Sequence, residues 1–402
     1  MIRLAYISQL TLVTPLKDQR YDRAEPPGFL ERAGVHYYRR LTDSRRAITQ
    51  SGLRLDELPS DSLLQSRMRL VGIWACLFAA LLGAASSAIP VWFEYHQNHK
   101  LDEAAFYSAW IAITLGSTLI EFAALFWLSL MAVHRISAIT GHSTEEDDPY
   151  LPGDDAIPNL LARAALELPD PVVRYLGVDP MKHISRSRLL IIGLLYKAKV
   201  LLSTVAAKFI LQRFGGKMVS RVGLAWVSVP VAAIWNAIVM YQVLREARLR
   251  LYGHRLAYYL IRDVMTEEFS SQLSPLAREG AIRAISTMMV MTQSYHPNML
   301  ILLYQFSRDL DVRDQSNYDD WDHFIDVLCQ VDERERFFLL DLLSIAAAFD
   351  GKLSKLQKQR LPEAFGEYTP PYMARIERLR YHLVSGHINE ATRDCQLDFL
   401  PG

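Results

Sequence analysis

Polar side chains that interrupt long apolar runs are the first candidates for chemistry in this chain of 402 residues. Glu121 is the one charged residue of the run 106–133, and Asn236 interrupts the uncharged run 222–244. A charge at mid-membrane is costly, so such groups usually pair, snorkel to the interface or face water. With the lysine-bearing segment 189–212, the intramembrane polar set comprises Glu121, Lys197, Lys199, Thr204, Lys208 and Asn236.

Two kinds of chemistry fit this set. Glu121 and either Lys197 or Lys199 lie at similar predicted depths and could form an intramembrane ion pair. Alternatively, the stripe formed by Lys197, Thr204 and Lys208 lines an oligomeric channel or transporter. The simplest interpretation is that the lysines snorkel and Glu121 is protonated.

A second group of candidate residues lies on the segment 317–330. Carboxylates and an imidazole recur there at helical spacing, which is a pattern that could bind a divalent metal. These candidates are Asp319, Asp322, His323 and Asp326. Because an exposed face opposite a core face gives the same pattern, we assign no metal and expect no cofactor.

Composition and motifs argue against two classes of protein. The 44 basic and 44 acidic residues leave no net charge, so we expect no nucleic-acid partner. None of the motifs G-x-G-x-x-G, G-x-x-x-x-G-K-[ST], G-x-S-x-G and H-E-x-x-H occurs, so we predict no enzyme and no catalytic residue.

The elements that must position these residues are predicted to be helices in a membrane. The runs 70–93 and 106–133 contain 24 and 28 residues, which exceeds the ~20 residues that cross a bilayer. The run 222–244 is a third candidate, and 189–212 is a weaker fourth. The sequence therefore predicts an all-α polytopic membrane protein with two transmembrane hairpins, about four spans, and a cytoplasmic C-terminal helical domain.

Basic residues beside the spans predict the orientation. The apolar runs are flanked by the basic residues Arg67, Arg69, Arg135 and Arg245, which predicts that both termini are cytoplasmic. The predicted location is the inner membrane of the cell. The turn before the last run disagrees with this rule, since it contains Arg213, Lys217 and Arg221. A re-entrant or interfacial hairpin over 189–244 is therefore kept as an alternative.

Five regions follow from this division. They are a cytoplasmic N-terminal helical arm at 1–69, transmembrane hairpin 1 at 70–134, a cytoplasmic acidic linker at 135–188, transmembrane or partly re-entrant hairpin 2 at 189–244, and the helical domain at 245–402. A helix is expected over residues 29–49 of the basic arm, either near anionic lipid or simply solvated.

The C-terminal domain has one distinctive pattern. Residues 337–349 are almost wholly apolar and are predicted to form a helix at the buried centre of the domain. Asp350-Gly351 ends this helix, and Ser354 with Gln357 has the spacing of a capping box. This pattern resembles the tellurite-resistance TerB-like helical domain, over residues 300–400 at most. The resemblance implies a bacterial helical domain that binds metal in some members. That family often has acidic residues after the turn, where this chain has Lys352, Lys355 and Lys358.

These observations lead to two functional hypotheses. The first is a non-enzymatic integral membrane protein whose cytoplasmic helical domain is an interaction or stress-response module. The second is an oligomeric channel or transporter that uses the polar stripe of 189–212. The expected partners are the lipid bilayer, a second copy of the chain in a homo-oligomer, and a cytoplasmic protein.

Overall fold

The computed structural model describes residues 22–23, 28–46, 60–97, 102–142, 156–166, 173–174, 176, 178, 221–292, 296–310, 317–349, 351, 353–395 and 397. The segment 189–212, with Lys197, Lys199, Thr204 and Lys208, lies outside these residues. The ion pair and the pore stripe predicted from those four residues therefore stay predictions.

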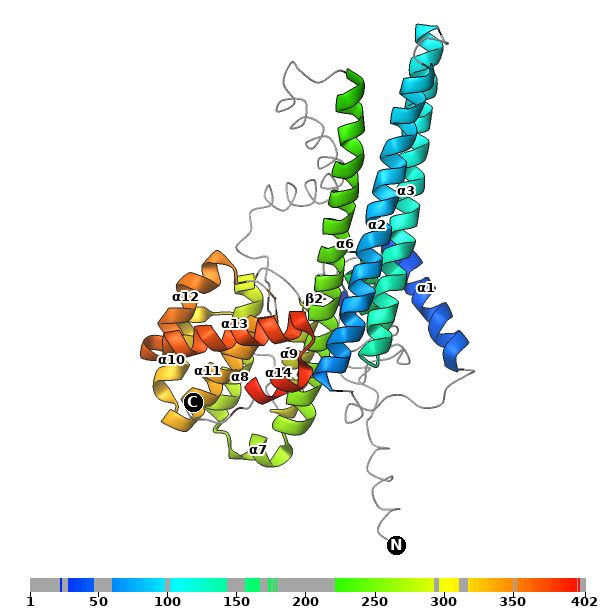
Figure 1. The fold of residues 1–402 in the computed structure, drawn as a ribbon. Helices are drawn as coiled ribbons and strands as arrows, with labels where there is room; N and C mark the ends of the chain where they lie inside the picture. Colours follow the sequence, from blue (N-terminus) through cyan, green and yellow to red (C-terminus); the bar gives the residue numbers. More distant parts are fainter. Residues whose placement is uncertain are drawn as a thin grey trace.

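The described part of the chain is helical, as the sequence predicts, apart from one antiparallel pair of two-residue strands, β1 (Asp22–Arg23) and β2 (Val173–Arg174). Three long helices, α2 (Asp61–Gln97), α3 (Glu103–Ile139) and α6 (Arg221–Tyr259), form a shaft that projects from a globular domain (Figure 1). Helix α2 packs against both α3 and α6.

Two described helices, α2 and α3, are long and apolar enough to cross a membrane. The core helix of a soluble protein would be mostly buried. In the most apolar 18-residue stretch of α2 only 17% of the residues are buried, and in that of α3 only 6%. Large apolar side chains such as Trp74, Phe78, Leu119 and Phe122 are about half exposed or more. A contiguous exposed apolar surface of this kind is typical of a membrane or protein contact.

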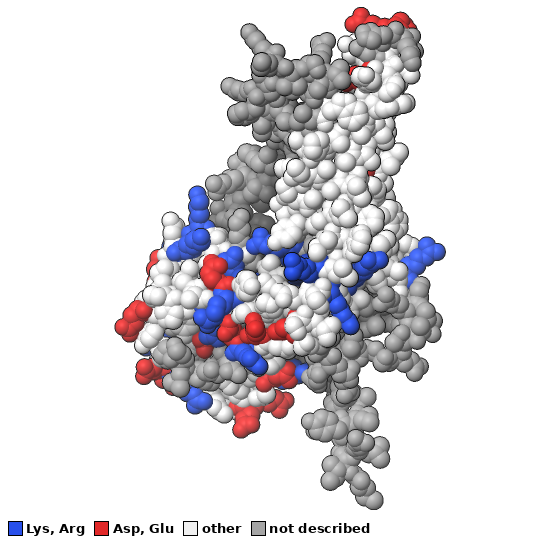
Figure 2. Space-filling model, in the orientation of Figure 1, with Lys and Arg blue, Asp and Glu red and all other residues white. Residues whose placement is uncertain are grey.

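The charge distribution separates the molecule into two zones (Figure 2). Most of the visible shaft surface carries neither acidic nor basic side chains, whereas the globular domain carries both. Lysine and arginine side chains gather where the shaft meets the domain. This is the arrangement that a membrane boundary would favour, since basic groups prefer the cytoplasmic interface.

Two helices cross the region boundaries expected from the sequence. Helix α2 begins at Asp61, before the apolar run 70–93, and it continues through Pro90. Pro90 is buried, and packing by neighbouring helices can compensate the lost backbone hydrogen bond. The expected domain boundary at 244/245 lies inside the continuous helix α6.

The N-terminal arm and the acidic linker are packed together. Helix α1 (Phe29–Arg46) forms within the predicted range 29–49 and contacts α4 (Ala156–Leu166), a helix in the region expected to be an acidic linker. A buried ion pair of 2.6 Å joins Glu31 and Arg163, and the Tyr38 hydroxyl donates to the Leu130 carbonyl of α3 at 2.9 Å. The linker prediction missed α4 because its apolar face is short and follows an acidic run.

The globular domain surrounds one apolar helix. Its elements are the π-helical turn η2 (Leu260–Val264), α7 (Glu267–Gln272), α8 (Pro275–Thr292), α9 (Pro297–Asp309), α10 (Trp321–Gln330), α11 (Glu333–Phe349), α12 (Lys355–Phe365), η3 (Gly366–Tyr368), α13 (Thr369–Ser385) and α14 (Ile388–Asp394). Residues 337–349 of α11 are all buried, as predicted. The predicted capping box is also present, with Ser354 and Gln357 bonding reciprocally at the start of α12.

Candidate functional site

A polar centre lies between the three helices of the shaft. The two carboxylate oxygens of Glu121 on α3 each accept one hydrogen bond, from the Ser86 hydroxyl of α2 and from the Asn236 amide of α6. Both bonds measure 2.6 Å. Glu121 is half-buried and Asn236 is buried, so this centre joins three helices in otherwise apolar surroundings.

Gly83 makes this close arrangement possible. A Cβ atom at position 83 would lie 2.6 Å from the carbonyl oxygen of Ala232 and 2.6 Å from the Asn236 amide nitrogen. The absence of a side chain therefore lets α2 approach the backbone of α6. Ser86 lies three residues further along α2 and reaches Glu121 on α3.

The chemistry of this centre follows from its donors. The carboxylate oxygens of Glu121 are acceptors, and the Ser86 hydroxyl and the Asn236 amide each supply one donor. One side chain of α3 is thereby tied to both neighbouring helices, so the centre can hold the three helices of the shaft together.

Sequence reasoning identified part of this centre. The structure brings together Glu121 and Asn236, which come from separate apolar runs. It adds Ser86, which was missed. The signal was the run of small residues 83–88 on α2, because small residues mark close contacts between membrane helices.

We predict that Glu121 and Asn236 are energetically coupled. Glu121→Leu and Asn236→Leu should each lower the stability of the purified protein in detergent, while the double variant should lose less than the sum. Side-chain hydrogen bonds between membrane helices couple by about 0.6–2 kcal/mol, which sets the expected difference. Equilibrium unfolding of the four proteins measures it, and strictly additive losses would contradict the contact.

A buried histidine pair lies at the base of the shaft. His142 follows the end of α3, and its Nε2 atom lies 3.0 Å from Nδ1 of His254 on α6. Its Nδ1 atom lies 2.9 Å from the Thr140 hydroxyl, and Arg255 donates to the Thr140 carbonyl at 2.9 Å. Burial, with Arg255 and His254 nearby, holds the pKa of His142 well below 6.5.

This pKa shift predicts acid-sensitive stability. The folded protein keeps His142 neutral, whereas the unfolded chain binds a proton below pH 6.5. The contribution of His142 to the free energy of unfolding is therefore fully present above that pH. It falls as the pH drops further, by up to ~1.4 kcal/mol per pH unit. Unfolding of wild type and His142→Gln between pH 5 and 8 checks this, and an unchanged slope in the variant would contradict it.

The four predicted metal candidates near α10 are dispersed. Asp319 is buried, whereas Asp322, His323 and Asp326 are exposed. His323 lies 3.6 Å from Glu279, and Asp322 lies 3.9 Å from Arg360. Among the described residues, the group whose ligand atoms lie within 4.8 Å is instead His382, His387 and Glu390.

Comparison of the chain with protein-family models, curated proteins and solved structures finds no match. The proposals that follow are therefore based on the side chains and the geometry described above.

Proposed function

We propose that this chain is a non-enzymatic integral membrane protein of the inner membrane, with about four spans and both termini in the cytoplasm. Its C-terminal helical domain acts as an interaction or stress-response module, and its partner is a cytoplasmic protein. The exposed apolar surfaces of α2 and α3 support membrane insertion. The basic side chains at the base of the shaft support the orientation (Figure 2).

Helix α6 is the observation that carries this proposal. Its upper part packs along α2 and supplies Asn236 to the polar centre. Residues 249–257 of its lower part are buried in the helical domain, where Leu251, Tyr252 and Leu256 are at most 1% exposed. One continuous helix therefore belongs to both the shaft and the domain (Figure 1).

A second contact fixes the domain to the shaft. The carboxylate of Asp61, the first residue of α2, accepts hydrogen bonds from the Asn389 side chain at 3.0 Å and from the backbone N–H groups of Asn389 and Glu390 at 3.2 and 3.4 Å. Those backbone groups lie in the first turn of α14, where a carboxylate is favourable. A domain held at two points presents a fixed surface to a partner.

Cysteine labelling tests the topology. Single cysteines at positions 98, 150 and 377 of a cysteine-free variant would be probed with a membrane-impermeant thiol reagent. Position 98 should react from outside, and positions 150 and 377 should react only after the membrane is opened. Labelling of position 377 from outside would contradict the proposal.

The channel is the second candidate function, and the polar centre among α2, α3 and α6 is the observation that favours it. Four helices alone rarely enclose a pore, so a channel requires an oligomer. Mass measurement of the detergent-purified protein and ion flux into proteoliposomes separate the two functions. If the protein is an interaction module, we expect no ion flux. An oligomer that gives steady flux, with the flux reduced by Glu121→Leu, would contradict the module and support the channel.

A further inference from the structure

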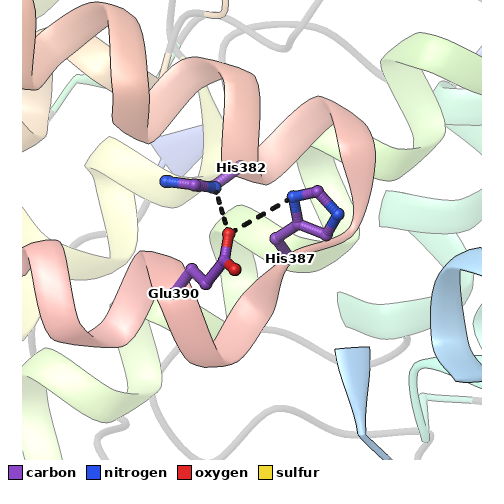
Figure 3. Close-up of side chains that lie close together, drawn as sticks. All are labelled: His382, His387 and Glu390. Atoms are coloured by element: carbon purple, nitrogen blue, oxygen red, sulfur yellow. Dashed lines mark ion pairs between the residues drawn. The ribbon is translucent and has the colours of Figure 1, made fainter. Parts of the chain in front are cut away.

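Two histidines and a glutamate meet where α13 turns into α14 (Figure 3). His382 lies in the last turn of α13, His387 directly precedes α14, and Glu390 lies in its first turn. Gly386 between them has a φ of 85°, a left-handed conformation that favours glycine. The N–H groups of Gly386 and His387 both donate to the His382 carbonyl at 2.9 Å. This turn brings the two imidazoles to the same side.

The distances from Glu390 to the two histidines fit one small cation, and the three ligand atoms all lie within 4.8 Å of one another. The Glu390 Oε2 atom lies 3.1 Å from Nδ1 of His382 and 3.5 Å from Nδ1 of His387. Ligands at about 2.0–2.1 Å from a tetrahedral Zn²⁺ stand ~3.3–3.4 Å apart, which matches these two separations. Both Nδ1 atoms are buried, and each faces Glu390 in an ion pair that lacks the geometry of a hydrogen bond (Figure 3).

The surroundings of His382 resemble the outer shell of a metal site. Its other ring nitrogen, Nε2, faces the Asp394 carboxylate at 3.6 Å. Arg378 donates to the same carboxylate at 3.3 Å and orients it. In metal sites a carboxylate commonly accepts the N–H of a ligating histidine, which fixes the tautomer and leaves the opposite nitrogen for the metal. For His382 that nitrogen is Nδ1, which points at Glu390.

We propose that His382, His387 and Glu390 form a binding site for a divalent transition metal, with Zn²⁺ as the best fit. Imidazole nitrogens favour transition metals over Mg²⁺ and Ca²⁺, which prefer oxygen ligands. Three protein ligands leave a fourth position for water or for a side chain of a partner. The site differs from the acidic residues near α10 that the sequence singled out.

The site is coupled to the contact between the domain and the shaft. Glu390 supplies a carboxylate to the metal, and its backbone N–H donates to Asp61 of α2. A bound ion would fix the first turn of α14 and thereby strengthen the contact with α2. Metal that binds the folded state stabilises it, so the thermal midpoint should rise with metal concentration.

Metal titration of the full-length protein in detergent tests the proposal. Metal is first removed from wild type with a chelator. When Zn²⁺ is then titrated in and the sample is dialysed, the protein should retain one equivalent per chain. When Co²⁺ is titrated in instead, the protein should show the visible absorption of tetrahedral Co²⁺. The double variant His382→Gln/His387→Gln should lose both signals. His323→Gln, which changes an exposed histidine on α10, is the matched control and should keep them.

Two further variants keep the test decisive if the double variant fails to fold. His387→Cys should retain the ion and add a sulfur-to-cobalt charge-transfer band absent from wild type. Asp394→Asn should weaken binding by about 10–100-fold without removing it. The proposal is overturned if wild type binds well below one equivalent, if the folded double variant binds as wild type does, or if folded His387→Cys lacks the new band.

Discussion

Asp341→Asn should lower the free energy of unfolding by about 3–5 kcal/mol, the usual cost of breaking a buried ion pair. Asp341 is 2% exposed on the apolar helix α11. Its Oδ1 atom accepts hydrogen bonds from Arg375 and, at 3.1 Å, from the Tyr372 hydroxyl, both on α13. Arg375 also donates to the Asp394 carbonyl at 3.0 Å, so one network links α11, α13 and α14.

The control for this prediction is Glu377→Gln on the same helix as Arg375. Glu377 pairs with Arg380 at 2.9 Å, but its side chain is 60% exposed, and exposed pairs contribute at most about 1 kcal/mol. Equilibrium unfolding in detergent compares the two variants. A double variant, Asp341→Leu/Arg375→Met, should lose less than Asp341→Asn, because it leaves no buried charge without its counter-charge. Equal losses of stability in Asp341→Asn and Glu377→Gln would show that the buried pair contributes no more to the free energy of unfolding than the exposed pair does.

Gly83→Ala should destabilise the shaft by about 1–3 kcal/mol, the usual cost of overpacking. The new Cβ would meet the backbone oxygen of Ala232 at 2.6 Å, and a helix backbone cannot yield as a flexible side chain can. The same Cβ would lie 2.6 Å from the Asn236 amide nitrogen that donates to Glu121, so it would also displace this donor. Loss of stability should therefore accompany loss of the coupling between those two residues.

Gly116→Ala is the matched control in the same bundle. A Cβ atom added at position 116 of α3 would meet no neighbouring atom within 4 Å, so the new methyl group enters open space. Alanine favours helix over glycine by up to about 1 kcal/mol, so this variant should be neutral or more stable. Thermal unfolding of both variants in detergent measures the difference. A similar loss of thermal stability in Gly83→Ala and Gly116→Ala would contradict the close approach at Gly83.

The fold could be predicted where one local pattern determined it. The uncharged runs predicted the apolar centres of α2 and α3, and the apolar stretch 337–349 predicted the buried helix α11. Helix ends were harder to predict. Helix α2 begins at Asp61, whose carboxylate accepts a hydrogen bond from Asn389 of α14, more than 300 positions away, and local sequence carries no signal of such a contact.

The candidate sites show the same limit. Glu121 stands out as the one charge in its run, but its two donors lie 35 positions before and 115 positions after it. The cluster at His382 is local, yet its spacing of five and three residues matches no single helix face. It depends on the left-handed turn at Gly386, which brings the end of α13 and the start of α14 together.

The length of α6 has a mechanical consequence. Its 39 residues extend about 58 Å at the helical rise, with Pro230 near the upper end. Membrane helices adjust to bilayer thickness by tilting. Below Pro230 the helix is continuous until it enters the globular domain, so in the proposed membrane arrangement a tilt of the shaft would rotate the domain by the same angle. The orientation of the domain relative to the membrane surface would therefore follow bilayer thickness.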